Sequence, residues 1–326
     1  MNYFLSGRRQ QVMVDGVFSK EESVDSGVPQ GTVMGPLLFL LFINDIPNNL
    51  STGTTIRLFA DDCLVYREIR SPEDQIQLQR DLAILEEWSK TWGMSFNPSK
   101  CTILRTRPGS KPPLQHFYTL HGQILKEVPT AKYLGVLLSN DLSWSPHVDS
   151  TAHKANQKLG FIRRNLRGSP TKSKCMAYTS VVRSGMEYAS AIWDPFSKRD
   201  INKLEMVQRK AARWVKSSYT PTTSVTKLLQ ELKWANFGDR RGNLRLILFY
   251  KIYHNYVEIP HSDIGLIPSS RPSRRNTKQV YRQRASTDTL KNSFALKTSS
   301  DWNILPDSTV SVGSVSHFKS QLTAQP

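Results

Sequence analysis

The sequence predicts an α+β protein in which a unit of strands and helices precedes a mainly helical region. Short β-favouring runs meet turn signals in the first 140 residues, and a long segment there repeats leucine at helical spacing. From about residue 147 the apolar residues recur at helical spacing, while Gly and Pro become sparse. At 326 residues the chain exceeds the usual length of one domain, so we expect several parts.

Two β-hairpins are predicted in the first unit. Residues 11–14 alternate in polarity and meet Asp15-Gly16, a two-residue hairpin signal, before Val17-Phe18. Residues 55–59 and 63–66 are β-favouring runs joined by acidic residues, which fits a second hairpin.

Between and after these hairpins the sequence predicts two helices. Residues 27–31 are too rich in Gly and Pro for regular structure, and Gly35-Pro36 then begins a helix over the apolar run to Ile46, which we expect to be buried. Ser71-Pro72-Glu73-Asp74 provides an N-cap, a first-turn proline and an acidic residue, and predicts a helix that ends near Gly93.

The remaining elements are predicted from shorter patterns. We expect strand pieces at residues 94–96 and 102–104, a strand at 132–138, a helix at 200–214 (capped by Asp200), a helical region at 225–256, and an exposed linker at 268–284. Aromatic anchors return near the end of the chain, in Phe294, Trp302 and Phe318.

The charge of the chain is unevenly distributed. Residues 151–326 carry 30 Lys and Arg against 11 Asp and Glu, whereas residues 1–150 carry 14 against 16, within a net charge of +17. A basic block of this kind favours a polyanion such as nucleic acid, although many basic proteins simply have solvated basic faces. The longest apolar run, residues 37–43, is far shorter than the roughly 20 residues of a membrane span, so no membrane partner is expected.

Two short motifs carry candidate chemistry. Asp61-Asp62 taken alone is most simply a turn, because Asp hydrogen-bonds its own backbone. Apolar residues on both sides would nevertheless hold the carboxylates on a rigid, buried-walled support, an arrangement that suits Mg²⁺. The loop at 27–31 has the plain interpretation of a break between a strand and a helix, but the Gln30 amide can bind a base or sugar, and the glycines permit close backbone approach.

Together these motifs resemble those of reverse transcriptases of non-LTR (LINE-type) retrotransposons. The resemblance rests on Ser26-Gly27-Val28-Pro29-Gln30-Gly31-Thr32-Val33-Met34-Gly35-Pro36-Leu37-Leu38-Phe39, followed by Phe59-Ala60-Asp61-Asp62, Asn97-Pro98-Ser99-Lys100-Cys101 and Tyr133-Leu134-Gly135-Val136 in the order typical of that family. The match is strong over residues 25–140 and weaker beyond. It implies RNA-templated DNA synthesis from a primer 3′ hydroxyl.

The resemblance also implies a role for each motif residue. Asp61 and Asp62 would be catalytic carboxylates that hold Mg²⁺, with Mn²⁺ as an alternative, and Lys100 would protonate the departing pyrophosphate. The residues implied to bind substrate are Gln30, Gly31 and Phe59, and those implied to grip the primer are Tyr133, Leu134 and Gly135. The implied partners are an RNA template, a DNA primer and deoxynucleoside triphosphates, with the oligomeric state left open.

On this resemblance the chain divides into four predicted parts. Residues 1–140 would form a partial right-hand fingers and palm with an antiparallel sheet and packed helices, 141–260 a basic helical thumb-like region, 261–290 a basic linker and 291–326 a C-terminal tail. The family's further catalytic Asp lies on a strand well before the 27–31 loop, and neither Asp15 nor Asp25 matches its position. We therefore expect an incomplete carboxylate set.

Three interpretations remain open from the sequence. The first is a polymerase-derived domain of a mobile element, truncated at its N-terminus. The second is a non-catalytic remnant whose basic half binds RNA or DNA while the palm serves as scaffold. The third is a fragment that does not fold stably, because a palm without its neighbouring strands exposes a sheet edge.

Overall fold

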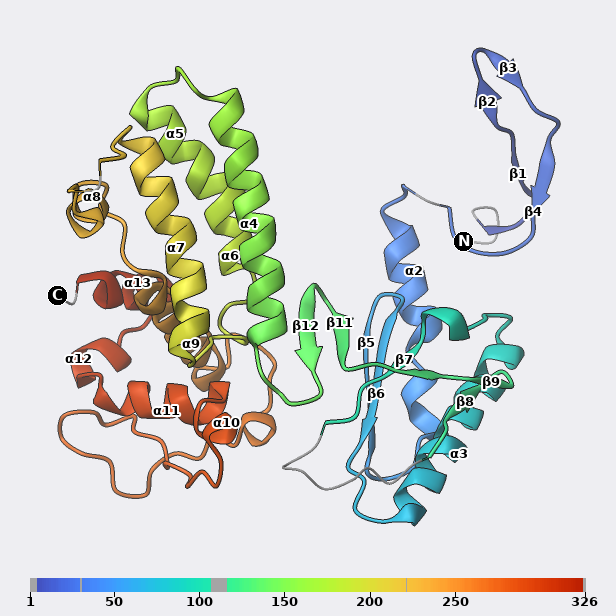
Figure 1. Ribbon diagram of the computed structural model, residues 1–326. Helices are drawn as coiled ribbons and strands as arrows, with labels where there is room; N and C mark the ends of the chain where they lie inside the picture. The colour runs from blue at the N-terminus through green and yellow to red at the C-terminus, as the bar shows by residue number, and fades with distance from the viewer. Residues whose placement is uncertain (1–4, 30, 107–115, 221, 325–326) are drawn as a thin grey trace. The chain divides into compact units, whose positions relative to one another are not determined.

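The computed structural model describes residues 5–29, 31–106, 116–220 and 222–324 (Figure 1). The chain splits into two compact units, one of Met1–Ile103 with Gly109–Val128 and one of Leu104–Pro108 with Pro129–Pro326. The first unit mixes strands and helices and the second is mainly helical, in agreement with the predicted α+β class. The finer four-part division of the chain stays a prediction.

Short strands and two long helices build the first unit. Its elements are β1 (Arg8–Gln10), β2 (Met13–Val14), β3 (Val17–Phe18), β4 (Glu22–Val24), α2 (Met34–Ile43), η1 (Ile46–Asn49), β5 (Thr54–Phe59), β6 (Asp62–Arg67), α3 (Pro72–Thr91), η2 (Pro98–Lys100), β7 (Thr102–Ile103), β8 (Thr119–Leu120), β9 (Gln123–Ile124) and β10 (Lys126–Glu127). The described strands pair two by two: β1 with β4, β2 with β3, β5 with β6, β7 with β10, and β8 with β9.

The local signals explain most of these elements. Asp15 and Gly16 both have positive φ, 51° and 82°, as the tight turn between β2 and β3 requires. Ser71 and Asp74 form the predicted capping box at the start of α3. One face of β5–β6 packs against α2 and α3 in a core of Ile43, Ile46, Ile56, Leu85 and Trp88.

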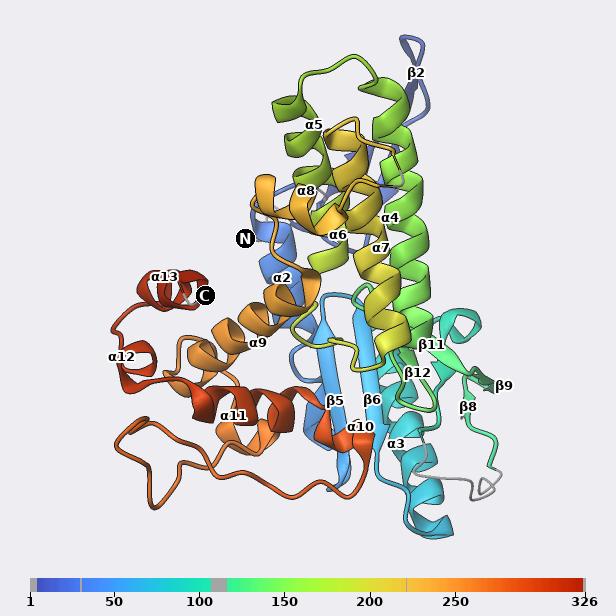
Figure 2. The same cartoon turned by 60° about the vertical axis from the view of Figure 1, so that its left-hand side comes forward.

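The second unit begins with one hairpin and continues as helices. Its elements are β11 (Thr130–Tyr133), β12 (Val136–Ser139), α4 (Ser145–Asn165), α5 (Thr171–Ala177), the π-helix η3 (Tyr178–Arg183), α6 (Ser184–Glu187), α7 (Lys198–Val215), α8 (Val225–Glu231), α9 (Phe237–Tyr253), η4 (His261–Ile264), α10 (Asp288–Lys291), α11 (Phe294–Ile304), α12 (Asp307–Val310) and α13 (Val315–Ala324). In this unit α4 and α7 run side by side (Figure 2).

Two cores hold the helices of this unit. The first lies among α4, η3 and α7 and contains the fully buried Trp193, Tyr178 and Val207. The second joins α9 to the C-terminal helices around Trp302 and Phe318, both fully buried. The predicted aromatic anchors Trp302 and Phe318 thus hold the end of the chain against α9.

Several element predictions are corrected. Helix α2 is not buried, because Leu37, Leu40 and Leu41 are each more than half exposed. Residues 132–138 form two strands, because Leu134 and Gly135 make a tight turn between β11 and β12. Residues 94–96 form no strand.

Further corrections concern the second unit. Asp200 does not cap helix α7: Ser197 occupies the N-cap position without a side-chain capping bond, and the buried Asp200 carboxylate accepts a hydrogen bond from Ser145 Oγ at 2.6 Å. The expected exposed linker is partly buried: Asn276 donates from Nδ2 to the Trp302 carbonyl at 2.9 Å, and Val280 joins the C-terminal core. No helix in the described part of the chain is long and apolar enough to cross a membrane.

Candidate active site

The tip of the β5–β6 hairpin presents the two acidic residues. Phe59 pairs with Asp62 at the end of the ladder, so Ala60 and Asp61 form a two-residue turn. Ala60 has a φ of 50°, a left-handed conformation that costs energy for any residue with a Cβ. The hairpin therefore ends in a turn with local strain, in which Asp61 lies, and Asp62 follows as the first residue of β6.

The two faces of this hairpin differ. Successive side chains of a strand point to opposite faces, so Ile56, Leu58 and Val65 share the face that packs on α2 and α3. Phe59 and Asp62 share the other face, where Phe59 is 63% exposed. The expected rigid support lies behind the tip as the apolar core. The expectation that buried walls surround the carboxylates is wrong, because Asp61 and Asp62 are themselves exposed.

Helix α3 anchors the opposite end of the hairpin. The buried Asp81 carboxylate accepts hydrogen bonds from Ser51 N at 2.9 Å, Ser51 Oγ at 2.6 Å and Thr54 Oγ1 at 2.5 Å. Arg67 donates to the Thr52 carbonyl at 3.0 Å and pairs with Asp74 at 3.2 Å. Burial alone would raise the pKa of Asp81, but these hydrogen bonds from Ser51 and Thr54 bring it below its usual value.

Lys100 lies at the end of η2, close in space to β6. Asn97 starts this turn by accepting from Ser99 N at 3.1 Å, and Lys100 is exposed. Although Cys63 as a whole residue is exposed, desolvation of its thiol, and secondarily the neighbouring Cys101 thiol, raise its pKa to about 11. Phe96, which directly precedes this turn, packs in the same core as Leu58 and Val65 and so holds the segment that carries Lys100 against the hairpin.

The loop at residues 27–31, here called the glycine loop, is fixed by hydrogen bonds from one residue before it and one residue after it. Arg8 Nη2 donates to the carbonyls of Ser26 at 3.0 Å and Gly27 at 2.7 Å. Thr32 Oγ1 donates to the Pro29 carbonyl at 2.9 Å and accepts from Gly35 N at 3.1 Å, which starts α2 directly after the loop. Gly31 has a φ of 77°, which favours glycine.

Close packing also explains Gly35. A Cβ at that position would lie 3.0 Å from the Pro29 carbonyl oxygen, which is tighter than ordinary contacts. Gln30, the predicted binding residue of the loop, lies outside the described residues.

The predicted primer-grip residues form the β11–β12 turn in the second unit. Leu134 and Gly135 have φ of 44° and 84°, as a tight turn between antiparallel strands requires. Tyr188 Oη donates to the Leu134 carbonyl at 3.1 Å. A Cβ on Gly135 would lie 3.1 Å from the Tyr188 ring, so glycine lets the turn and the ring pack together.

The chemistry available at the tip follows from charge. Among the residues that the structure describes, Asp61 and Asp62 form no ion pair, and no group of three acidic, His or Cys side chains is placed to hold a metal ion. Two adjacent exposed carboxylates fit a hard divalent cation that keeps positions open for phosphate oxygens. Sequence reasoning missed Arg8, Asp81 and Tyr188, because their partners lie 18 to 54 residues away along the chain.

The family model of reverse transcriptase (RNA-dependent DNA polymerase) matches residues 3–138. Those residues form a reverse transcriptase domain. The matched segment contains the glycine loop, the Asp61-Asp62 hairpin, Lys100 and the Leu134-Gly135 turn. Proteins of this domain family generally use divalent metal ions.

Proteins of insect mobile elements resemble the chain beyond this domain. It is 30% identical over 254 residues to the RNA-directed DNA polymerase from mobile element jockey of Drosophila funebris, a match that covers 73% of this chain and 27% of that relative. It is 29% identical over 297 residues to the probable RNA-directed DNA polymerase from transposon X-element of Drosophila melanogaster, covering 86% and 31%.

A third relative is the probable RNA-directed DNA polymerase from transposon BS of Drosophila melanogaster, 31% identical over 224 residues, which cover 64% of this chain and 24% of the relative. These matches confirm the predicted kinship of the reverse transcriptase domain with non-LTR retrotransposons. The chain spans less than a third of the length of each of these relatives. No solved structure gives a significant match.

Proposed function

We propose that this chain contributes the palm and thumb of an enzyme that extends a DNA primer on an RNA template. The β5–β6 hairpin with its backing helices is the palm, and the helices after residue 140 form the thumb-like region. One observation carries the proposal: within a reverse transcriptase domain, Asp61 and Asp62 occupy the tip of a hairpin that is packed from behind and open in front.

In this mechanism Asp61 and Asp62 would hold Mg²⁺, or Mn²⁺ in its place. A divalent cation held there would supply positive charge that neutralises the triphosphate and favours ionisation of the primer 3′ hydroxyl. The primer 3′ oxygen, whose proton passes to water, forms a bond to the α-phosphorus as the bond to pyrophosphate breaks, and Lys100 supplies a proton to the departing pyrophosphate. Phe59, on the same hairpin face as Asp62, shapes the nucleotide pocket, while Gln30 and Gly31 contact nucleotide or template.

A primer-extension assay with an RNA template and Mg²⁺ tests this proposal. The native chain should extend the primer, and Asp61→Asn/Asp62→Asn should not, because amides cannot replace the carboxylate charge at the metal. Asp15→Asn is the matched control: Asp15 also occupies a hairpin turn, and Asn tolerates its left-handed backbone. Absence of primer extension by the native chain would contradict the proposed activity of this chain.

The second candidate function is a non-catalytic nucleic-acid-binding protein of the same lineage. It is favoured by the excess of 30 basic over 11 acidic residues in residues 151–326. Such a protein would bind RNA or duplex with a strong dependence on salt and without any need for Asp61 and Asp62. Salt-insensitive binding, or no binding, would rule out this candidate.

A further inference from the structure

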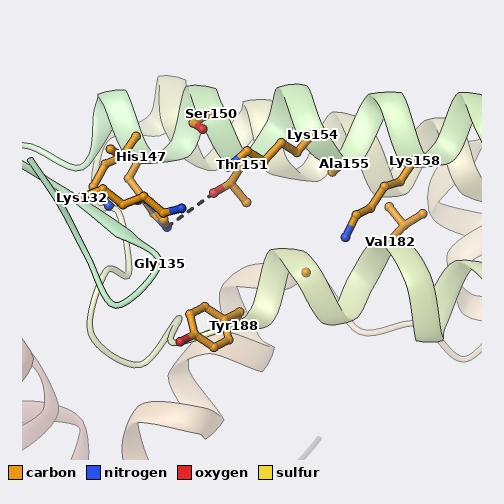
Figure 3. Close-up of a pocket in the computed structure, with 12 residues that line it drawn as sticks. Lys132, Gly135, His147, Ser150, Thr151, Lys154, Ala155, Lys158, Val182 and Tyr188 are labelled. Atoms are coloured by element: carbon orange, nitrogen blue, oxygen red, sulfur yellow. Dashed lines mark hydrogen bonds between the residues drawn. The ribbon is translucent and has the colours of Figure 1, made fainter. Parts of the chain in front are cut away.

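A small pocket in the second unit is lined by three lysines and by no acidic residue. It has a volume of about 180 Å³ and lies between the β11–β12 hairpin, α4 and the η3–α6 segment (Figure 3). Lys132 comes from β11, and Lys154 and Lys158 come from α4. One ordered water needs about 15 Å³, so the pocket has room for a larger polar group.

The lysines keep their positive charge unneutralised. No ion pair joins Lys132, Lys154 or Lys158 to a carboxylate within the described residues. Carboxylates of the surrounding elements are already paired: Glu187 with Arg240, and Asp149 with Lys203. Three like charges around one cavity repel one another in the folded protein, and an anion would relieve that repulsion.

His147 and Thr151 add oriented polar groups to this pocket. Leu137 N donates to His147 Nδ1 at 3.1 Å, so this nitrogen carries no proton and the ring is neutral with its proton on Nε2. Burial, and secondarily Lys154, lower the pKa of His147 to about 4, in agreement with a neutral ring. His147 Nε2 lies 3.4 Å from Thr151 Oγ1, which therefore accepts from it and keeps its own hydroxyl proton for another acceptor.

The spacing along α4 gathers these groups on one helix face. His147, Thr151, Lys154 and Lys158 are separated by three or four residues, which is one helical turn. Gly185 of α6 leaves room for the Lys158 side chain, because a Cβ there would lie 3.3 Å from Lys158 Nζ. The lysines are exposed, so a ligand as large as a polymer strand can reach them.

We propose that this pocket binds one phosphodiester group of a nucleic acid strand. Lysine ammonium groups and a hydroxyl donor are the groups that bind phosphate oxygens, and none of them reads base identity. The phosphate chemistry follows from the pocket itself, whereas the choice of a nucleic acid as its source rests on the proposed function.

Duplex binding without nucleotides tests the pocket apart from catalysis. Fluorescence anisotropy with a labelled RNA–DNA duplex would compare the native chain with Lys154→Gln/Lys158→Gln over a range of salt concentrations. The double variant should bind about tenfold more weakly, and its salt slope should fall by about one. Lys172→Gln/Lys198→Gln removes two exposed lysines outside the pocket and should change affinity less than about twofold.

A series of duplexes, each with one phosphate replaced by a neutral methylphosphonate, locates the phosphate that the pocket binds. In the native chain, a methylphosphonate at one position should weaken binding more than a methylphosphonate at neighbouring positions. The same replacement should have no extra effect in Lys154→Gln/Lys158→Gln, because the effects of two groups that contact each other are not additive. Equal effects of the linkage in both proteins would overturn the proposal. The melting temperature of the variant should be unchanged or higher, because removal of two like charges relieves repulsion.

Titration calorimetry with inorganic phosphate separates the two sources of a phosphate group. Tight binding of free phosphate that the double variant abolishes, with unchanged duplex affinity, would overturn the proposal in favour of a small phosphate compound. The absence of any salt-sensitive duplex binding would overturn it as well. Absence of primer extension alone would contradict only the polymerase activity.

Discussion

At the scale of single residues, the positions of the catalytic candidates depend on a few buried polar groups. Asp81 connects α3 to the start of β5 through its three hydrogen bonds from Ser51 and Thr54. A carboxylate that is buried this way stabilises the fold only while its hydrogen bonds are made. Asp81 therefore sets the position of the hairpin that ends at Asp61 and Asp62.

Replacement of Asp81 by Asn should lower the stability of the first unit by about 2 kcal/mol, since charge-assisted hydrogen bonds are lost inside the protein. The lowered pKa of Asp81 also gives a pH dependence. Because its folded pKa lies below its unfolded value of about 3.9, its contribution is complete above that value and is lost as the pH falls through the folded pKa.

Urea unfolding between pH 6 and pH 2.5, followed by circular dichroism, would measure both effects. The difference between native and Asp81→Asn chains should be largest near neutral pH and should shrink in acid. A difference that stays constant or grows in acid would contradict this assignment. Glu68→Gln, in an exposed ion pair with Arg70, should leave stability at neutral pH unchanged.

Gly135 is a second residue with a single structural role. With a φ of 84° and the Tyr188 ring 3.1 Å from the position of an added Cβ, any side chain there should strain the turn. Gly135→Ala should destabilise the second unit by about 1–2 kcal/mol. Thermal unfolding checks this, with Gly168→Ala as control because a Cβ added at Gly168 would meet no atom within 4 Å and its φ is not positive. Equal melting temperatures for both variants would contradict the prediction.

At the scale of elements, the sequence correctly predicted the helix and the hairpin whose positions are set by local signals. The capping box at Ser71 and Asp74 defines the start of α3, and the two β-favouring runs around Asp61-Asp62 define the central hairpin. The turn at Leu134-Gly135 was missed, because an apolar run reads as one strand and leucine rarely occupies a left-handed turn position.

The predictions that failed depend on what surrounds an element. The apolar run of α2 predicted burial, yet among its residues only Gly35 and Ile43 are buried in the described chain. Periodicity and composition identify apolar side chains but not the layer that covers them. The same reason applies to the candidate site: the motif predicted Asp61, Asp62 and Phe59 as site residues, while their exposure and the support from Asp81 needed the structure.

An ion cluster joins a loop and two helices of the second unit. The buried Asp194 accepts from Arg241 Nε at 2.7 Å and from Lys297 Nζ at 2.6 Å, and lies 3.2 Å from Arg245 Nε. Burial opposes its charge, but the hydrogen bonds from Lys297 and Arg241 hold the pKa of Asp194 below its usual value. This residue joins α9 to α11.

Asp194→Asn should therefore cost about 3–5 kcal/mol, because two buried arginines would lose their common counter-ion. Amide hydrogen exchange should show the loss of protection in α9 and α11. Exchange in α3, which belongs to the other compact unit, should stay unchanged. Protection that is lost equally in α3 would contradict the assignment of Asp194 to one unit.

At the scale of the whole molecule, charge and chemistry reside in different parts of the chain. The matched reverse transcriptase domain contains the acidic hairpin tip, whereas residues 151–326 carry the excess of basic side chains. A polymerase needs both properties, since its carboxylates hold cations and its basic surfaces hold a polyanion. The proposed function thus explains the uneven charge: the acidic tip holds the cations, and the basic region binds the nucleic acid.

The central claim is that the Asp61-Asp62 tip binds a divalent cation, and this does not depend on turnover. Fe²⁺ bound in place of Mg²⁺ generates hydroxyl radicals that cut the adjacent backbone when ascorbate and peroxide are added. Fragment masses should place the cuts around residues 59–64, Mg²⁺ should suppress them, and Asp61→Asn/Asp62→Asn should abolish them while Asp15→Asn does not. Cleavage elsewhere, or the same cleavage in the double variant, would contradict the claim.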